Sequence, residues 1–154
     1  MKIYKWLIGL VSAIFFIMVI AWLSSYFHTP QAQWYMSLVK PEKMAGALLY
    51  DICEIIAYLF TALAMSKLIV KRIFGMPFVF ILSAGILYVI FLACIFSLHN
   101  IRAGAVALAA VLALDILVIL KTLFKEPLCA LFYAPVFCWH IYLFCTTVFI
   151  ALHN

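Results

Sequence analysis

Five long apolar runs constrain this chain more than any other feature of its sequence. Each contains about 20 residues or more, the length that a helix needs to cross the hydrocarbon core of a bilayer. They occupy residues 6–27, 46–70, 77–98, 103–124 and 127–152. In lipid, a backbone amide must find its hydrogen-bond partner within its own segment, so we expect these runs to be helices. The sequence therefore predicts a single all-α domain, an integral membrane bundle of five transmembrane helices.

The composition places the chain in a lipid bilayer and excludes a water-soluble protein. Hydrophobic residues make up 71% of the 154 residues and charged residues 10%, whereas a soluble domain carries about 25% charged residues. The net charge of +5 comes from Lys and Arg scattered at the ends of the apolar runs, with no basic stripe. We therefore expect contact with anionic lipid headgroups and not with nucleic acid.

The distribution of charge between the loops predicts the orientation. Seven basic residues fall on the side of the amino terminus and three on the other side, which by the positive-inside rule makes the amino terminus cytoplasmic. The first run is expected to be a retained helix, because the sequence after Ser24 and Ser25 is a poor signal-cleavage site. With no mitochondrial import signal evident, we expect a bacterial inner membrane. The seven residues are Lys2, Lys5, Lys67, Lys71, Arg72, Lys121 and Lys125.

Three acidic residues inside the apolar runs are candidates for a functional role. A charge at the bilayer centre costs about 2.5–3.5 kcal/mol on insertion scales, so each should face the bundle interior. Asp51 and Glu54 are three residues apart and share one face of the second helix, while Asp115 lies deep in the fourth run. His140 is the expected titrating partner. Two interpretations stay open: polar groups held by Tyr, His or backbone carbonyls, or a ligand-contacting or proton-handling site.

Cysteines and small residues have simpler interpretations. The five cysteines all lie in apolar runs, and with no CxxC motif or other ligand cluster we expect packing residues and no metal site. Ala105, Ala109 and Ala113 place a small residue at every fourth position of the fourth run, which favours close helix packing and, secondarily, a homodimer contact. The cysteines are Cys53, Cys94, Cys129, Cys138 and Cys145.

The longest loop, residues 28–45, contains an unusual polar and aromatic stretch. Residues 34–46 read WYMSLVKPEKMAG, and its Trp and Tyr favour the headgroup level of a membrane. The pattern W-Y-x-x-L-x-x-P, formed by Trp34, Tyr35, Leu38 and Pro41, resembles the loop signature of the TspO/MBR family. This family comprises the tryptophan-rich sensory proteins and mitochondrial translocator proteins, which have five helices and about this length.

Further motifs extend the resemblance over nearly the whole chain after the first run. Tyr58 and Ala64 match the family's LY-x-x-MG-x-A segment. At the end of the third run, Phe96, Leu98 and the following His99 resemble its FFGLH segment. The remaining matches lie in the fifth run: Pro135 and Trp139 fit PY-x-x-W, and Asn154 falls on the family's closing Asn.

The chain also departs from the family pattern. Ala45 and Gly46 replace its paired prolines, and Glu54 replaces the tryptophan of its second helix. Its helix-three Asn and Trp are Tyr88 and Phe91 here. The cholesterol-type pattern is absent from residues 144–154, which contain no Tyr, Lys or Arg. The loop after His99 needs a small insertion to follow the family pattern, so nothing of that pattern is carried over to the fourth run.

The resemblance implies a membrane sensor or carrier that binds porphyrin, haem or another flat hydrophobic molecule, with no obligatory cofactor. The implied pocket lies inside the bundle, with loop 28–45 as its lid through Trp34, Leu38 and Pro41. Glu54 would favour a ligand with a cationic or hydrogen-bond-donating edge. Trp139, Tyr35, Tyr58 and Phe91 could supply stacking faces, and Glu54, Asp51, Tyr88 and His140 polar contacts.

Two other function classes are weighed against a binding protein. A proton- or cation-coupled transporter would use Asp51, Glu54 and Asp115 as an intramembrane relay. An enzyme acting on a tetrapyrrole would need a nucleophile and a base, and the sequence offers no such pair. We therefore expect a binding protein, with transport as the alternative and no catalytic residues.

Overall fold

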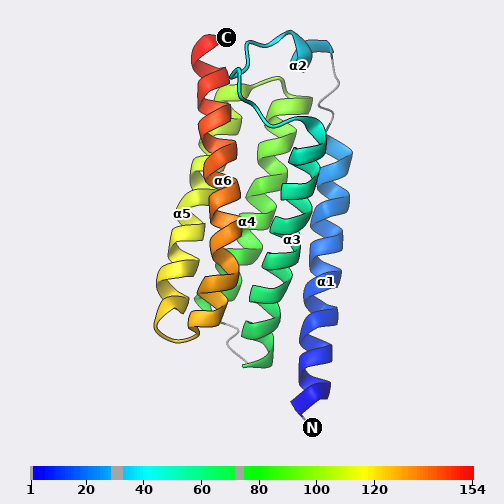
Figure 1. Cartoon of the computed structure of the whole chain (residues 1–154), viewed down its shortest axis with the longest axis vertical. Coiled ribbons are helices and arrows are strands. Elements are labelled where there is room, and N and C mark those ends of the chain that lie inside the picture. Colours follow the sequence, from blue (N-terminus) through cyan, green and yellow to red (C-terminus); the bar gives the residue numbers. More distant parts are fainter. Residues whose placement is uncertain (1, 29–32, 72–74) are drawn as a thin grey trace.

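The computed structural model describes residues 2–28, 33–71 and 75–154, and within them every regular element is helical. Five helices are long and apolar enough to cross a membrane, so the predicted fold class, an all-α five-helix membrane bundle, is confirmed (Figure 1). The short helix α2 lies in the first loop, and a π-helix, η1, continues α4. The elements are α1 (Lys2–Phe27), α2 (Gln33–Ser37), α3 (Ala47–Val70), α4 (Met76–Leu92), η1 (Ala93–Ser97), α5 (Ile101–Leu123) and α6 (Pro127–His153).

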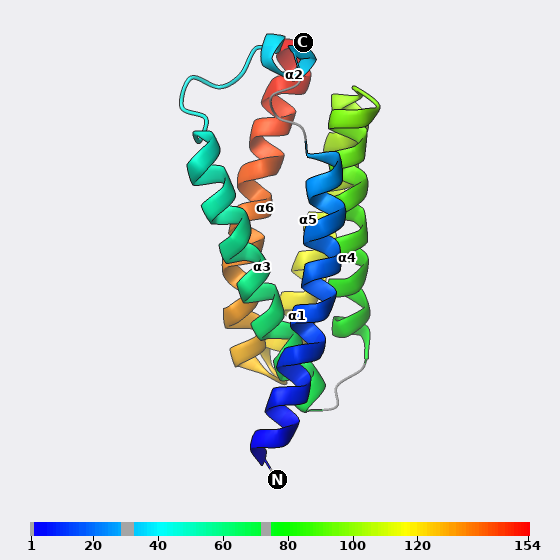
Figure 2. The ribbon, with the colours of Figure 1, turned by 90° about the vertical axis from the view of Figure 1, so that its right-hand side faces the viewer.

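The five long helices form a closed ring in an order that differs from the order of the chain. Around the ring, α1 packs against α3, α3 against α6, α6 against α5, and α5 against α4, and α4 returns to α1 over a thinner contact. The two termini lie at opposite ends of the bundle, and α2 lies at the end that holds the carboxyl terminus (Figures 1 and 2). Residues from all five helices can therefore meet in the middle.

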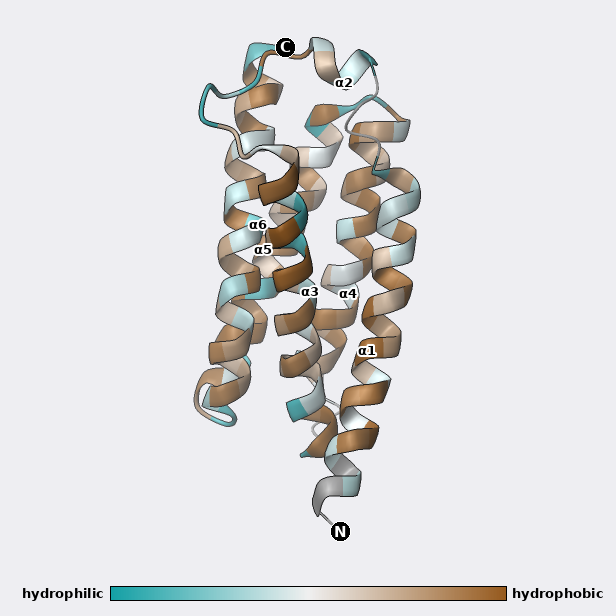
Figure 3. Cartoon of the chain, turned by 45° about the vertical axis from the view of Figure 1, so that its right-hand side comes forward, coloured by the Kyte–Doolittle hydropathy of each residue, from teal (hydrophilic) through white to brown (hydrophobic). Residues whose placement is uncertain are grey.

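Two clusters of buried side chains hold the ring together. One surrounds Phe91, Leu108 and Trp139, and the other surrounds Met65 and Tyr133. The outer faces of the helices are largely apolar as well (Figure 3), as expected where lipid tails replace water. Because lipid and core are equally apolar, the helices associate by shape and by polar contacts rather than by burial of apolar surface.

Small residues set the distance between neighbouring helices at specific points. A Cβ atom added to Gly104 of α5 would lie 2.7 Å from Cγ1 of Ile95 in η1, so this close approach requires glycine. By contrast, Ala109 and Ala113 are exposed, so these two members of the predicted small-residue ridge are not used for packing within the chain.

The end of the bundle opposite α2 is held by charged contacts. Lys71 forms an ion pair with Glu126 at 3.1 Å, an interaction that contributes about 0–1 kcal/mol at an exposed site. Nζ of Lys67 lies 4.4 Å from the ring centre of Trp6 and links α3 to α1. The side chains of Lys2 and Lys5, and residue Arg72, which entered the orientation prediction, lie outside the described residues.

Candidate functional site

Residues 33–46, which precede α3, cross the end of the bundle (Figures 1 and 2). We call residues 33–46 the cap; residues 29–32 of the predicted lid lie outside the described part of the chain. Three contacts with residues distant in the sequence hold the cap in place. These contacts are Trp34 with His99, Val39 with Asn154, and Ala45 with Tyr142.

Each contact has defined geometry. The rings of Trp34 and His99 stack with their centroids 4.4 Å apart, and His99 can face the cap because it adopts a left-handed backbone (φ 52°) at the end of η1. The backbone N–H of Val39 donates to Oδ1 of Asn154 at 2.9 Å, and Nδ2 of Asn154 donates to the Val39 carbonyl at 3.1 Å. The carboxyl terminus therefore clamps the middle of the cap.

A cavity of about 490 Å³ lies beneath the cap, and we call it the outer cavity. Its volume falls within the range of about 300–1,000 Å³ typical of small-molecule sites. Residues from the cap, α3, the α4–η1 region, α5 and α6 line it. The aromatic residues among them are His28, Tyr35, Tyr50, Phe91, Phe96 and Tyr142.

Two basic side chains, His28 and Lys40, line the outer cavity. His28 lies between the rings of Tyr50 and Phe96, with centroid separations of 5.1 and 5.0 Å. Burial lowers the pKa of His28 below its ordinary value, against the opposing influence of Glu54 and Asp51, so the ring is neutral at pH 7. The Lys40 ammonium lies 4.3 Å from the Tyr35 ring centre, and desolvation lowers its pKa.

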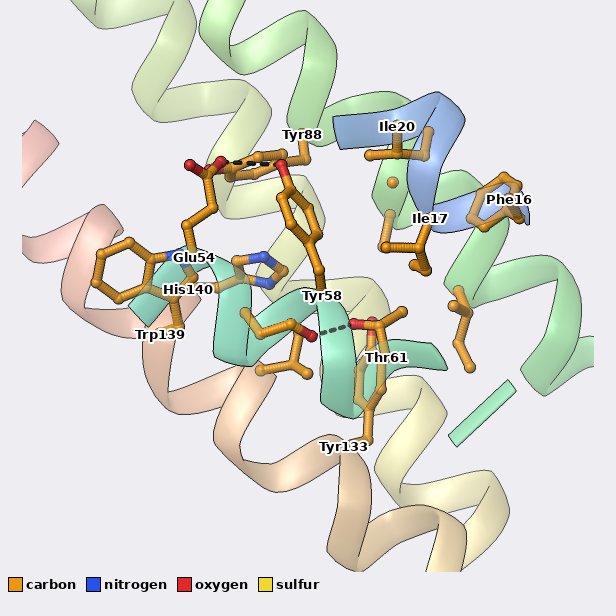
Figure 4. A pocket seen from close by; sticks show the side chains of 15 residues that line it. Phe16, Ile17, Ile20, Glu54, Tyr58, Thr61, Tyr88, Tyr133, Trp139 and His140 are labelled. Carbon is orange, nitrogen blue, oxygen red and sulfur yellow. Dashed lines mark hydrogen bonds between the residues drawn. The ribbon is translucent and has the colours of Figure 1, made fainter. Parts of the chain in front are cut away.

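A second, smaller cavity of about 40 Å³ lies among α1, α3, α4 and α6 (Figure 4), and we call it the inner chamber. Glu54 points into it, and one carboxylate oxygen, Oε1, accepts hydrogen bonds from the hydroxyls of Tyr58 at 2.9 Å and Tyr88 at 2.8 Å. Side chains from α1, including Phe16 and Ile20, form its apolar side. Glu54 is thus held by two tyrosines that come from different helices.

Asp115 lies next to the inner chamber and is completely buried. Its Oδ2 atom lies 2.6 Å from Nδ1 of His140, and its Oδ1 atom accepts a hydrogen bond from Tyr133 at 2.8 Å. The expectation that His140 partners an intramembrane acid is therefore confirmed. The His140 ring packs 5.5 Å from the ring of Tyr88, so a continuous series of polar side chains runs from Glu54 to Asp115.

A single layer of aromatic rings separates the two cavities. Trp139 lines the inner chamber, and it packs edge-on against Tyr50 at 5.0 Å and face-on against Tyr142 at 5.4 Å. Tyr50 and Tyr142 belong to the outer cavity. Nε1 of Trp139 is buried and has no hydrogen-bond partner in the described part of the chain.

The residues that the sequence assigned to one pocket are divided between these two cavities. Tyr35, Pro41, Asp51 and Phe91 line the outer cavity. Trp34 and Leu38 line neither: Trp34 holds the cap against His99, and the Leu38 amide lies 3.4 Å from the Tyr35 carbonyl oxygen at the end of α2. The predicted site residues that line the inner chamber are Glu54, Tyr58, Tyr88, Trp139 and His140.

Sequence reasoning missed several residues of the outer cavity, chiefly Tyr50, Tyr142 and His28. Helical spacing could have indicated two of them: Tyr50 precedes Glu54 by four positions, and Tyr142 follows Trp139 by three, so each shares a helix face with a predicted site residue. His28 directly follows the first helix, where no spacing rule applies.

In comparisons with known proteins, no family model and no curated protein matches the chain.

Proposed function

We propose that this protein is a membrane sensor or carrier that binds a flat, largely apolar molecule of the porphyrin or haem type in the outer cavity. The observation that carries the proposal is the cavity of about 490 Å³, walled by aromatic rings and roofed by the cap. Ligand sites of this kind combine a mostly apolar lining with a few polar groups that fix orientation. The described structure has these properties at the end of the bundle where α2 lies.

The lining suits the chemistry of a tetrapyrrole. Aromatic side chains such as Tyr35 and Phe91 offer faces on which a flat ring can stack. Lys40 can pair with a peripheral carboxylate, and the exposed carboxylate of Asp51 can accept a hydrogen bond from an N–H group or pair with a cation. Because Glu54 lies behind the aromatic layer, Asp51 takes the role in ligand preference that the sequence analysis gave to Glu54.

The resemblance to the TspO/MBR family supports the same proposal, with this chain as a divergent member. Motif residues that are far apart in the sequence act together here: Trp34 from the loop signature stacks on His99 from the third-run motif. The closing residue, Asn154, holds the cap over the cavity through Val39. These contacts give the matched positions a shared physical purpose, the closure of a ligand site.

Charge at the two ends of the bundle supports an orientation with the amino terminus in the cytoplasm. Lys67, Lys71, Lys121 and Lys125 lie at the end opposite the cap, and Lys40, Lys43 and Arg102 lie at the cap end. By the positive-inside rule, the outer cavity then lies at the non-cytoplasmic side of a bacterial inner membrane.

The proposal is tested by filling the cavity. Thr146 lines the outer cavity. Within the described part of the chain, its hydroxyl bonds only backbone carbonyls of its own helix, so Thr146→Phe adds bulk without removing a hydrogen bond between helices. Cys145→Phe, one residue earlier and exposed on the outer surface, is the matched control. Titration of purified protein with protoporphyrin, followed by quenching of tryptophan fluorescence, should show binding weakened by about tenfold or more in Thr146→Phe alone. Equal binding by the two variants, or no quenching in the wild type, would refute the proposal.

Proton- or cation-coupled transport is a second candidate function, favoured by the buried series from Glu54 to Asp115. Ionisable groups at this depth commonly mark proton or ion pathways. Transport of the same ligand into liposomes that depends on a pH gradient, and that Glu54→Gln abolishes while equilibrium binding persists, would favour this function. Flux that is indifferent to Glu54→Gln would exclude Glu54 from such a pathway.

A further inference from the structure

A groove opens on the lipid-facing side of the bundle between α3 and α6, close to the cap. It encloses about 410 Å³ and is formed on one side by Leu49, Cys53 and Ile56 of α3 and on the other by Pro135 and Cys138 of α6. All of these side chains are apolar or thiol-bearing. Pro135 provides no backbone N–H to α6, which weakens the helix locally at this groove. We call this feature the lateral groove.

The lateral groove and the outer cavity share a wall. Ala45 of the cap and Tyr142 of α6 line both of them. The backbone N–H of Ala45 donates a hydrogen bond of 2.8 Å to the Tyr142 hydroxyl, and the Tyr142 ring stacks on Trp139. One side chain and one hydrogen bond therefore separate the ligand cavity from a groove that faces lipid.

We propose that the lateral groove is the entry portal through which an apolar ligand dissolved in the bilayer reaches the outer cavity, with Tyr142 as its gate. The proposal rests on the proposed function, since it concerns the route of the same ligand. A flat apolar molecule partitions from water into the bilayer because burial of its apolar surface is favourable, so it approaches the protein from the side. Its occupancy of the groove is transient and leads to the cavity.

The contacts of the cap favour this route over entry from water. Entry from above requires the cap to release Trp34 from His99 and Val39 from Asn154. Entry from the side requires that Tyr142 leave its hydrogen bond with Ala45 and its stack on Trp139, while both of those cap contacts stay in place. The lateral route thus breaks fewer interactions and keeps the ligand out of water throughout.

The test compares rates of ligand transfer with equilibrium affinity. Cys138→Trp fills the lateral groove, and Cys145→Trp, a substitution of another exposed cysteine on the same helix outside the groove, is the matched control. Full-length protein in lipid nanodiscs is mixed with vesicles that contain protoporphyrin, and ligand emission is followed in time. We expect Cys138→Trp to slow association and dissociation alike, by about tenfold, with an unchanged Kd, and Cys145→Trp to match the wild type.

A second variant tests the gate itself. Tyr142→Phe keeps the ring but removes the hydroxyl that accepts from Ala45, and we expect both rates to rise by about three- to tenfold, the factor associated with one hydrogen bond. Identical transfer rates in Cys138→Trp and Cys145→Trp would overturn the portal proposal. A lipid chain that permanently occupies the groove would also give identical rates, and it too would exclude the groove as a ligand portal. Absence of protoporphyrin binding at equilibrium in the wild type would instead overturn the proposed function and the portal with it.

Discussion

Removal of the Asp115 carboxylate should strongly destabilise the bundle. In Asp115→Ala, the hydroxyl of Tyr133 and Nδ1 of His140 both lose their partner in the core. Each buried polar group left without a partner costs about 1–3 kcal/mol, so two such groups cost about 2–6 kcal/mol. Side chains in a membrane-inserted unfolded state find some other partners, which reduces the difference between the two states. We therefore expect the free energy of unfolding to fall by about 2–4 kcal/mol.

The assay is reversible unfolding in mixed micelles of increasing denaturing-detergent content, followed by far-ultraviolet circular dichroism. Asp51→Ala is the matched control, because Asp51 is an exposed aspartate at the cap end of α3, and such a substitution changes stability by about 0.5 kcal/mol or less. Tyr133→Phe should lie between the two, since it removes one of the two hydrogen bonds. A loss in Asp115→Ala no larger than in Asp51→Ala would refute the description of Asp115 as a buried, fully partnered carboxylate.

Three further predictions concern the cap, the pH response and the helix packing. Asn154→Ala removes both hydrogen bonds to Val39, and amide hydrogen exchange at the cap should accelerate by about tenfold while the helices stay protected; unchanged exchange would contradict the clamp. Burial lowers the pKa of His28, so the His28 of an unfolded chain takes up a proton as the pH falls through about 6.5, while the ring in the folded protein stays neutral. The free energy of unfolding should therefore fall below that pH. In thermal melts between about pH 7.5 and pH 5.5, His28→Gln should abolish this part of the loss. Gly104→Ala should destabilise by about 1–3 kcal/mol, because the new Cβ would lie 2.7 Å from Cγ1 of Ile95. Ile95→Ala removes Cγ1, so it should cost less stability in the Gly104→Ala background than in the wild type; equal melting of Gly104→Ala and wild type would disprove this close approach.

The helices could be predicted from the sequence because their cause is local. A backbone segment in lipid must satisfy its own hydrogen bonds, so hydrophobic length alone indicates a transmembrane helix. The fourth run, expected at 103–124, is the helix Ile101–Leu123, which starts earlier because the Asn100 side chain caps it. The short helix α2 and the π-helix η1 were not expected, since both depend on contacts made by the cap and by the end of α4.

The pairing of Asp115 with His140 could be anticipated for a similar reason. Each lies near the middle of a long apolar helix, and in lipid an ionisable group at such a position requires a partner within the bundle. By contrast, the division of the site into two cavities could not be predicted. It depends on the rotation of α3 and α6, which places Tyr50 and Tyr142 against Trp139 and leaves Glu54 behind that layer. Sequence spacing gives the face that residues share but not the neighbour that this face meets.

The order of the helices in the ring could not be predicted from the sequence either. Short connections predict that consecutive helices are neighbours, yet α3 packs chiefly against α1 and α6 and only slightly against α4. This arrangement brings α6, with Trp139, beside α3 and under the cap. The shared wall of Tyr142 and Ala45 follows from the same arrangement, because it requires α6 to lie next to the segment that precedes α3.

The most direct test of the central claim is an experimental structure of the protein in nanodiscs with protoporphyrin bound. We expect ligand density beneath the cap, in contact with Tyr35 and Phe91, with Asn154 still hydrogen-bonded to Val39. Density confined to the outer surface of the five helices, with the outer cavity filled by side chains, would contradict it.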